Sequence, residues 1–448
     1  MTTCTLNAQE KTALTSMITT IPGDKSISHR AIMIGALAEN ISHFTNFLFS
    51  EDCLNTLAIF QALGVNITVS TQEKSVVIEG VGLHGLTAPA KTLEVGNSGT
   101  SIRLLSGILS GQKFTSTITG DTSIKHRPMK RVAGPLAQMG AVITGTSREG
   151  RQDIFPPLTI SKAPTGLQPI TYTLPVASAQ VKSCIIFASL YSDQRSTLIE
   201  PETCRDHTER LLRHYGADIE VNGPQIHVSG KHPLRCPDDV FYIPGDISSA
   251  AFFIVLGLIM KNSELTLTGI GLNPTRNRLI SVLQKMGADI EVFDIKNQDG
   301  EPYGTLRVRS SVLTNGPVDP ADVPIIIDEI PILAITALFG NGTFQVRDAQ
   351  ELRVKESDRI QSICHMINAM GGSITEYDDG FDLKGPAVLR PFEIDSHHDH
   401  RIAMSAIIGS IGGHVAATVH NCACINTSFP NFFDILSHLG VQYDLSHD

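Results

Sequence analysis

Apolar positions along the chain follow two alternating patterns. Long stretches carry the apolar spacing of a helix, and several are followed by short runs in which every second residue is apolar, which predicts a strand. Residues Ala288-Asp289-Ile290-Glu291-Val292 show the strand pattern clearly. A chain that alternates helices and strands in this way is predicted to be an α/β protein.

The passage from helix to strand has a repeated signature, a bulky residue followed by glycine. The glycines that carry it are Gly64, Gly140, Gly216, Gly287, Gly371 and Gly440. Each stands where the C-terminus of a helix needs a left-handed residue, a conformation that glycine adopts without steric cost. The sequence therefore predicts six similar βα units.

A second repeat relates the two halves of the chain. The run Ile21–Ser26 (IPGDKS) returns as Ile243–Ser248 (IPGDIS), and both runs precede apolar stretches of similar character. We interpret this as a duplication with three units per half, although a chance match of a common turn is an alternative. Pro-Gly suits a crossing between domains. We expect residues 22–243 to form an N-terminal domain, and residues 1–21 with 244–448 to form a discontinuous C-terminal domain.

Composition excludes several classes of protein. The 448 residues allow large apolar cores, and 35 Lys+Arg against 45 Asp+Glu give a net charge of −10. A protein that coats nucleic acid owes its affinity to clustered basic residues, so that class is disfavoured. An anionic small substrate in a local basic pocket remains compatible with this charge.

Cysteine usage and hydropathy indicate the compartment. The eight cysteines are scattered without a CxxC pair, which favours free thiols in a reducing environment. No secretory signal and no apolar run long enough to span a bilayer is present, so we expect a cytoplasmic protein without a membrane partner.

Three motif-like runs are interpreted as structural. Residues 80–85 fit GxGxxG, but Pro89 follows where a dinucleotide fold needs a helix, so we predict a turn. Gly23–Ser26 lacks the glycine that a P-loop has before its lysine. His397, His398 and His400 are not predicted to bind metal, because adjacent histidines point apart and no distant ligand stands out.

Polar clusters precede several apolar helical runs. They lie at Asp24-Lys25-Ser26, Gly96–Thr100, Ala177–Gln180, Asp328-Glu329 and Asp399-His400-Arg401. The N-termini of helices attract phosphate and carboxylate through free N–H groups, so these clusters predict a site for a polyanion. Asp24 is predicted to cap a helix that begins at Lys25 and that carries Ser26 and Arg30 on one face. Capped helices with solvated charges are the alternative.

The segment Arg353–Arg359 is predicted to be helical and to carry chemistry. On a helix, Lys355 and Glu356 would lie four and three residues before Arg359, which places a carboxylate among cations. Such surroundings can tune an acid or a base. A solvated run of charges is the alternative.

The ordered motifs resemble those of the 5-enolpyruvylshikimate 3-phosphate (EPSP) synthase family, with details most similar to its class II branch. The motifs that carry this resemblance are, in chain order, PGDKSISHRA, GNSGTSIRLLSG, KHRPMKRV, ASAQVKS, RDHTE, RVKESDR and DHRIAMS. The resemblance runs from Ile21 to the C-terminus. It implies two inside-out α/β domains, each of three repeated βα folding units with helices inside and sheet outside, and an active site in the interdomain cleft. It also implies a monomer.

The resemblance implies a reaction and a set of residues. The enolpyruvyl group of phosphoenolpyruvate would pass to the 5-hydroxyl of shikimate 3-phosphate with release of phosphate, without metal or organic cofactor. Asp328 would act as the base, Lys25 and Glu356 would handle the proton of the vinyl group, and Lys355 would contact the hydroxyl. Phosphoenolpyruvate, or the inhibitor glyphosate in its place, would meet Lys25, Gly99, Arg127, Gln180, Arg359 and Arg401. Shikimate 3-phosphate would meet Ser26, Arg30, Ser178, Gln180, Arg205, Asp328 and Lys355.

Two competing functions stay open at this point. The sister transferase that acts on UDP-N-acetylglucosamine has a reactive cysteine in a loop of its first domain, whereas this chain has Arg127-Pro128-Met129 there. A two-domain protein that binds anions without chemistry is the other. Such a protein has no need of Asp328, Lys355 and Glu356 among its cations.

Overall fold

The computed structural model describes residues 2–8, 13–237, 239–298 and 300–447. Its chain divides into two compact units. The N-terminal unit comprises Gly23–Ile243 with Gln298–Glu301, and the C-terminal unit comprises Met1–Pro22, Pro244–Asn297 and Pro302–Asp448. The grouping of Gln298–Glu301 with the N-terminal unit differs from the domain bounds drawn from the sequence.

Each unit repeats one pattern three times: an inner helix, an outer helix, a glycine and an antiparallel pair of strands. The inner helices are α1 (Lys25–Leu37), α3 (Gly99–Ser110) and α5 (Ala179–Ser189) in the N-terminal unit, and α7 (Ile247–Ile259), α10 (Ile330–Ala337) and α12 (His400–Gly413) in the C-terminal unit. The outer helices are α2 (Glu51–Ala62), α4 (Lys130–Gln138), α6 (His207–His214), α8 (Arg278–Lys285), α11 (Arg359–Ala369) and α13 (Phe432–His438). Every residue of α7 and α10 is buried, which suits helices that are apolar on all sides.

The six signature glycines adopt the predicted conformation. Their φ angles are +91° at Gly64, +92° at Gly140, +75° at Gly216, +94° at Gly287, +93° at Gly371 and +77° at Gly440. Each glycine follows the end of an outer helix and turns the chain into the next stretch. The prediction of left-handed glycines from the sequence is therefore confirmed.

Replacing Gly216 by Ala is expected to lower the free energy of unfolding by about 1–2 kcal/mol, the cost of a left-handed conformation for an L-residue. A Cβ atom there would meet no atom within 4 Å, so the cost is conformational and not steric. Urea unfolding of Gly216→Ala against the wild type measures this loss, and a gain in stability would contradict the argument.

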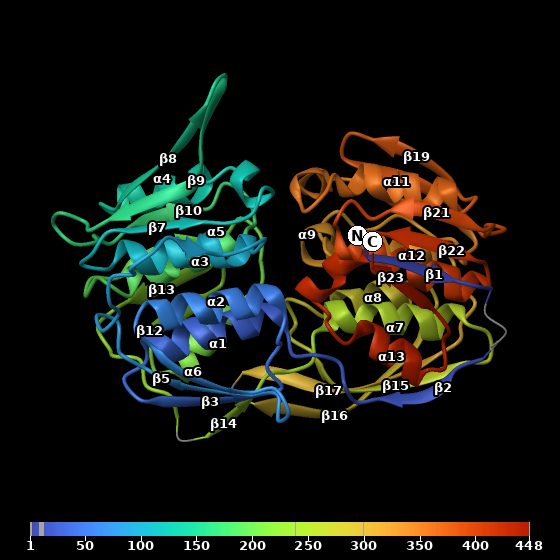
Figure 1. Ribbon diagram of the computed structural model, residues 1–448, viewed down its shortest axis with the longest axis horizontal. Coiled ribbons are helices and arrows are strands. Elements are labelled where there is room, and N and C mark those ends of the chain that lie inside the picture. The colour runs from blue at the N-terminus through green and yellow to red at the C-terminus, as the bar shows by residue number, and fades with distance from the viewer. Residues whose placement is uncertain (1, 9–12, 238, 299, 448) are drawn as a thin grey trace. The chain divides into compact units, whose positions relative to one another are not determined.

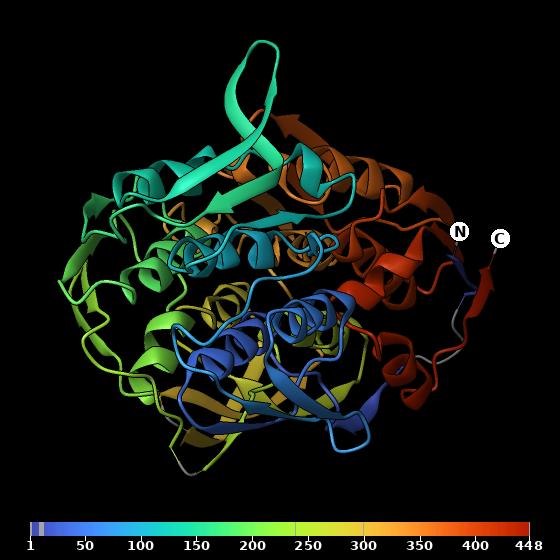
Figure 2. The same ribbon diagram turned by 60° about the vertical axis from the view of Figure 1, so that its left-hand side comes forward.

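The described strands form six sheets with closely related orders. In one of them β6 (Leu93–Glu94) is parallel to β7 (Ser116–Thr119), and an antiparallel pair, β9 (Arg151–Ser161) and β8 (Val142–Arg148), completes the sheet. The hairpin of β8 and β9 extends from the body of its unit in both views (Figures 1 and 2).

The other sheets have the following orders. They are β14 (Val240–Tyr242)-β3 (Ile41–Thr45)-β5 (Ser75–Glu79)-β4 (Asn66–Ser70); β10 (Thr171–Thr173)-β11 (Ser196–Ile199)-β13 (Gln225–Ser229)-β12 (Asp218–Asn222); β16 (Asp289–Gln298)-β17 (Glu301–Arg309)-β15 (Glu264–Gly271)-β2 (Thr15–Ile18); β18 (Gly342–Val346)-β20 (Gly380–Gly385)-β19 (Ser373–Tyr377); and β21 (Phe392–Asp395)-β22 (Ala417–His420)-β1 (Thr2–Leu6)-β23 (Asp444–His447). Shorter helical segments are α9 (Val323–Ile326), η1 (Ile124–His126), η2 (Gln350–Val354) and η3 (Cys422–Thr427).

The first strands of the chain complete sheets of the C-terminal unit. Strand β1 pairs antiparallel with both β22 and β23, and β2 runs parallel to β15 at a sheet edge. With β1 in place, its sheet has four strands, as have four of the other five described sheets. The first segment supplies strands that the second half of the chain lacks.

Helices lie inside and strands outside in each unit, as Figure 1 shows for α1 and α3 and for α7 and α12. The inner helices of a unit contact one another, and the strands cover them. The predicted inside-out α/β fold is confirmed. No helix in the described ranges is long and apolar enough to cross a membrane.

Candidate functional site

In the N-terminal unit, helix α1 begins as the sequence predicts. The Asp24 side chain accepts a hydrogen bond from the N–H of Ile27 at 2.9 Å, and Lys25 is the first residue of the helix. The Lys25 ammonium forms an ion pair with Asp52 of α2. The Asp52 side chain is buried, and a buried carboxylate needs a cationic or hydrogen-bonded partner. Sequence reasoning missed Asp52, whose pairing depends on the packing of two helices.

Gly99 opens helix α3 beneath two guanidinium groups. An added Cβ atom would lie 2.7 Å from Nη1 of Arg127 and 2.9 Å from Nη1 of Arg103. Arg127 also donates to Asn97 Oδ1 at 2.8 Å, which holds its guanidinium beside the start of the helix. A side chain at position 99 would therefore press on both guanidinium groups, and the predicted contact of Gly99 with phosphoenolpyruvate stays a prediction.

Gln180 is brought to the same place from α5. Its Oε1 accepts from Arg103 Nη1 at 2.5 Å, and its Nε2 donates to Thr100 Oγ1 at 3.1 Å. No role for Arg103 was predicted, although its position four residues after Gly99 puts it on the same helix face. Gly99, Arg127 and Gln180 thus form one group, with Arg103 as a link between them.

Arg30 is buried and points into the N-terminal unit. It donates to Ser26 O at 2.9 Å, to Thr208 Oγ1 at 2.6 Å and to Ser183 Oγ at 2.8 Å. Burial lowers the pKa of Arg30 to about 10, so the guanidinium stays charged at neutral pH. The structure connects Arg30 to the carbonyl of Ser26, and a ligand would share the guanidinium with two further internal partners, Thr208 and Ser183.

Two further predicted residues lie at the starts of helices. Ser178 caps α5 and accepts from the N–H of Val181 at 3.4 Å. Arg205 lies partly exposed in the loop before α6. The ligand that these two side chains are predicted to share stays a prediction.

The loop that carries Arg205 is tied to the core by Lys182. Lys182 is fully buried, with its Nζ 2.9 Å from Glu200 and 2.6 Å from Glu209. It also donates to the carbonyl of Cys204 at 3.3 Å. Burial alone would lower the pKa of Lys182, but the attraction of both carboxylates outweighs it and raises the pKa. Lys182 lies in the motif ASAQVKS, and the family resemblance implied no role for it.

In the C-terminal unit, Arg359 joins three carboxylates. Its guanidinium donates to Asp399 Oδ2 at 2.8 Å, Glu356 Oε2 at 2.6 Å and Asp328 Oδ1 at 3.2 Å. Burial disfavours the charge, but these carboxylates outweigh it and raise the pKa of Arg359 further. Lys355 Nζ lies 3.3 Å from the same Asp328 Oδ1. Four predicted residues are therefore in direct contact, although Arg359 has no need of a further anion in this arrangement.

The prediction that Lys355 and Glu356 lie on a helix with Arg359 is wrong. Segment η2 ends at Val354, the following residues form bends, and α11 begins only at Arg359. The reason is Asp358, which caps α11 by accepting from the N–H of Gln361 at 3.1 Å. An Asp followed three residues later by Gln is a signature of a helix start, so the sequence contained this signal.

Arg401 stands in the first turn of α12, where Asp399 accepts its N–H at 2.9 Å as a cap. Its Nη1 donates to the carbonyl of Ser248 at 3.3 Å and lies 3.9 Å from Glu329 Oε1. The Ser248 hydroxyl donates to Glu329 and accepts from Arg276 Nη2 at 2.6 Å. Glu329 and Arg276 are buried partners that sequence reasoning did not assign.

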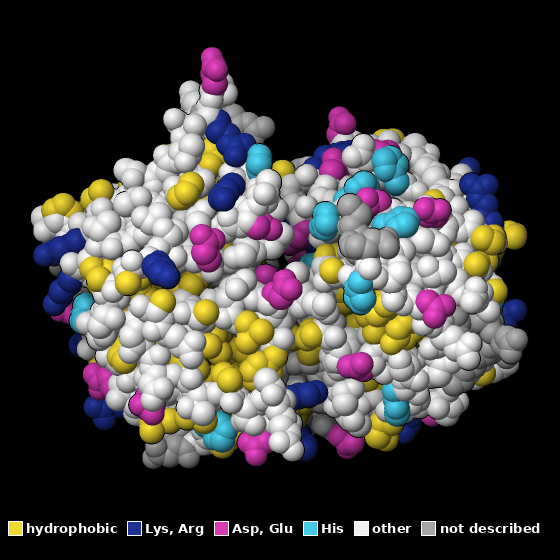
Figure 3. Space-filling view, in the orientation of Figure 1, with side chains coloured by type: hydrophobic (Ala, Val, Ile, Leu, Met, Phe, Trp, Pro, Cys, Tyr) yellow, Lys and Arg dark blue, Asp and Glu magenta, His cyan; other side chains and the backbone are white. Residues whose placement is uncertain are grey.

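Histidine side chains gather on the face of the C-terminal unit that Figure 3 displays. His420 lies 2.7 Å from Glu393 and 3.1 Å from Thr3. His397 and His398 both have positive φ in the turn before α12. Within the ranges that the structure describes, no group of three or more His, Cys, Asp or Glu side chains could hold a metal ion.

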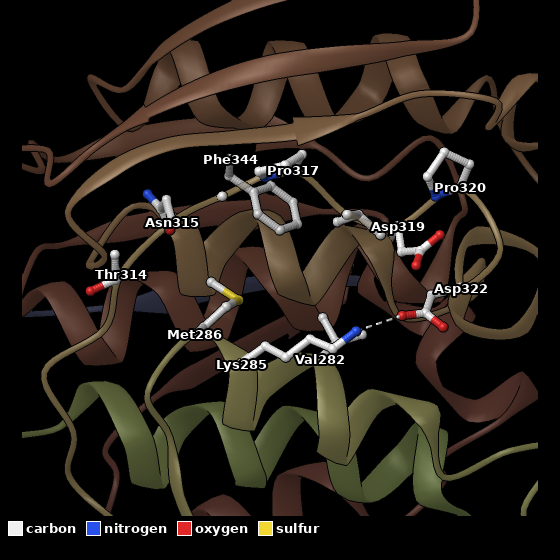
Figure 4. A pocket seen from close by; sticks show the side chains of 12 residues that line it. Val282, Lys285, Met286, Thr314, Asn315, Pro317, Asp319, Pro320, Asp322 and Phe344 are labelled. Atoms are coloured by element: carbon white, nitrogen blue, oxygen red, sulfur yellow. Dashed lines mark hydrogen bonds and ion pairs between the residues drawn. The ribbon is translucent and has the colours of Figure 1, made fainter.

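A cavity of about 400 Å³ lies elsewhere in the C-terminal unit, between α8 and the segment before α9 (Figure 4). Met286 and Phe344 line it, and Lys285 lies 3.5 Å from Asp322 at one side. No predicted site residue lines this cavity. The predicted site residues thus lie outside the cavity, most of them at the helix starts described above.

Comparison with solved structures gives the class of the fold. The enolpyruvyl transferase NikO from Streptomyces tendae superimposes with a TM-score of 0.78 over 99% of each chain at 15% sequence identity, which defines an enolpyruvyl transferase fold. The EPSP synthase from Acinetobacter baumannii superimposes with a TM-score of 0.87 over 100% of each chain at 41% identity.

Sequence comparison defines the family. Residues 8–436 match the family model described as EPSP synthase (3-phosphoshikimate 1-carboxyvinyltransferase). A protein from Citrifermentans bemidjiense named 3-phosphoshikimate 1-carboxyvinyltransferase is 46% identical, and the match covers 93% of this chain and 95% of the relative. A protein of the same name from Desulforamulus reducens is 43% identical, and the match covers 94% of this chain and 96% of the relative. The chain belongs to the EPSP synthase family, which confirms the resemblance.

Proposed function

We propose that the chain transfers the enolpyruvyl group of phosphoenolpyruvate to the 5-hydroxyl of shikimate 3-phosphate and releases phosphate in the shikimate pathway. Membership of the EPSP synthase family supports the activity. The observation that carries the chemistry is the contact of Asp328, Lys355, Glu356 and Arg359 in one cluster. The chain acts as a monomer in the cytoplasm, without a metal, an organic cofactor, nucleic acid or a membrane.

The reaction needs both an acid and a base. The substrate hydroxyl loses a proton, the vinyl carbon of phosphoenolpyruvate gains one, and the oxygen attacks the central carbon. Phosphate then leaves as the new methyl group loses a proton. We assign the base to Asp328, the handling of the vinyl proton to Glu356 and Lys25, and the contact to the hydroxyl to Lys355. Arg359 contacts both carboxylates and thereby holds Asp328 and Glu356 in one cluster.

The binding of two anions is assigned to the remaining residues. Guanidinium groups bind carboxylate and phosphate through two parallel hydrogen bonds, which suits Arg127, Arg359 and Arg401 for phosphoenolpyruvate. Lys25, Gln180 and the backbone at Gly99 complete that set. The set for shikimate 3-phosphate is Ser26, Arg30, Ser178, Gln180, Arg205, Asp328 and Lys355. The carboxylates already take four of the five N–H groups of Arg359, so a ligand would share this guanidinium with them or displace one of them.

Release of phosphate from phosphoenolpyruvate tests the proposed function. We expect release when shikimate 3-phosphate is present, without added metal, and none when UDP-N-acetylglucosamine replaces it. Binding of both anions without phosphate release would instead support the anion-binding protein. Release with UDP-N-acetylglucosamine would support the sister transferase, which the absence of a cysteine beside Arg127-Pro128-Met129 disfavours.

Glyphosate is expected to compete with phosphoenolpyruvate, and Gly99→Ala is expected to weaken the inhibitor much more than the substrate. The added methyl would press on Arg127 and Arg103, at 2.7 and 2.9 Å from their Nη1 atoms. Both contacts are the ends of flexible side chains, which can shift enough for phosphoenolpyruvate still to bind. The longer glyphosate would be overpacked, which weakens its binding by about 1–3 kcal/mol.

Inhibition constants for glyphosate and KM for phosphoenolpyruvate decide this prediction. Gly316→Ala is the matched control, because it adds the same methyl where no atom beyond its chain neighbours lies within 4 Å, and it should change neither constant. Equal losses for inhibitor and substrate in Gly99→Ala, or a wild type indifferent to glyphosate, would show that another feature shapes the pocket.

A further inference from the structure

A chain of buried hydrogen bonds links helices α1, α2 and α3 behind Gly99. His29 Nδ1 lies 2.9 Å from Thr56 Oγ1, which lies 2.6 Å from Ser101 Oγ. Ser101 Oγ in turn donates to Ser98 Oγ at 2.7 Å. All four side chains are at least 99% buried. The Ser98 oxygen that ends the chain is also the cap of α3, because it accepts from the N–H of Ser101 at 3.1 Å.

The proton order along this chain follows from the number of protons available. Each hydroxyl has one proton, and Ser101 donates its own to Ser98. Thr56 can donate to the Asp52 carbonyl at 3.1 Å or to Ser101 at 2.6 Å, and we assign its proton to the shorter contact. His29 completes the order by donating Nδ1–H to Thr56. Burial holds the pKa of His29 well below its usual value, so the ring is neutral and carries one N–H.

The chain lies one helical turn below the ion pair of Lys25 and Asp52. His29 follows Lys25 by four residues on α1, and Thr56 follows Asp52 by four residues on α2. Residues four apart lie on one face of a helix, so the ion pair and the hydrogen bond form two successive contacts between α1 and α2. Ser101 then extends the second contact to α3.

We propose that His29, Thr56 and Ser101 are positioning residues for the site of phosphoenolpyruvate. They hold Ser98 in the position from which its oxygen caps α3 by accepting from the N–H of Ser101. The first N–H groups of α3, at Gly99 and Thr100, then remain for an anion. They also hold the start of α3 in place relative to Lys25. This inference rests on the proposed placement of phosphoenolpyruvate at Gly99.

A pair of substitutions at Thr56 tests the proposal. Thr56→Val keeps the shape and removes the hydroxyl, and we expect the KM for phosphoenolpyruvate to rise about tenfold, in line with the loss of a well-formed helix cap. The dissociation constant of shikimate 3-phosphate should stay within about twofold of the wild-type value, because the residues proposed to contact this substrate lie outside the chain of hydrogen bonds. Thr56→Ser keeps the hydroxyl and should behave as the wild type.

Ser106→Ala is the matched control. Its hydroxyl is equally buried on α3 but donates to the carbonyl of Ile102 at 2.7 Å, outside the chain. It should leave both constants unchanged. If Thr56→Val fails to fold, Ser101→Ala breaks the same chain and should give the same selective rise in KM.

The outcomes separate this proposal from the proposed function. A wild type that releases no phosphate would overturn the function. An active wild type in which Thr56→Val matches Ser106→Ala, or in which both substrates weaken equally, would overturn the positioning role alone. Nitrogen-15 spectra give a second measurement: the His29 ring, assigned by its loss in His29→Asn, should carry its proton on Nδ1. A proton on Nε2 would overturn the order of the chain.

Discussion

Turnover is expected to fall by about 100-fold or more when Lys25 is replaced by Met, on the usual magnitude of general acid–base catalysis. Methionine keeps much of the stem but removes the ammonium that we assign to the phosphate and to proton transfer. In the structure this ammonium pairs with the buried Asp52, so the substitution also leaves that carboxylate without its cation. Steady-state phosphate release measures the loss.

Lys113→Met provides the control for Lys25→Met. Lys113 is exposed in the same unit and has no predicted role, so its turnover should equal that of the wild type. The double variant Lys25→Met/Asp52→Asn removes both charges and separates the loss of the ammonium from the effect of the unpaired carboxylate. Recovery of turnover in the double variant would show that the unpaired carboxylate caused the loss. Near-normal turnover of Lys25→Met itself would overturn the role of the lysine.

Asp328→Asn is expected to reduce turnover by about 100-fold to 10,000-fold, because an amide keeps the shape of the carboxylate but cannot take up a proton. Asp328 Oδ1 accepts from Lys355 and Arg359, and the amide oxygen can still accept both bonds. Binding of shikimate 3-phosphate, measured by calorimetry, should therefore stay close to that of the wild type.

The control for Asp328→Asn is Asp434→Asn. Asp434 is exposed in the first turn of α13 in the same unit and has no predicted role. We expect it to change neither turnover nor binding. If Asp328→Asn weakened binding as much as turnover, the carboxylate would be a structural anchor for Lys355 and Arg359 and not the base.

Features set by local sequence could be predicted. A glycine after a helix and an Asp or Ser before one act through their own backbone and the next three residues, so the left-handed Gly216 and the caps at Asp24 and Ser98 follow from short windows. The helix start at Asp358 is also a local feature of the sequence. The prediction missed it because the spacing of charges in Arg353–Arg359 was taken to indicate a helix, and the capping residue Asp358 was overlooked.

Features set by tertiary packing could not be predicted from spacing. Asp52 finds Lys25, and Glu329 finds Ser248, only because helices far apart in the sequence pack together. Both carboxylates are buried, yet nothing in the residues around them marks the partner. The motif resemblance supplied the residues expected to touch ligands, and the structure supplied those that hold them in place. The roles of both groups stay predictions until the substitutions are measured.

The position of β1 has a consequence for synthesis on the ribosome. Its partners β22 and β23 are among the last strands translated, so Thr2–Leu6 must wait for almost the whole chain before it can pair. The segment Gly23–Ile243 can fold as it emerges, because domains generally fold as units during translation. The nascent chain thus carries Thr2–Leu6 as an unpaired strand, which is a template for wrong pairing until β22 and β23 are made.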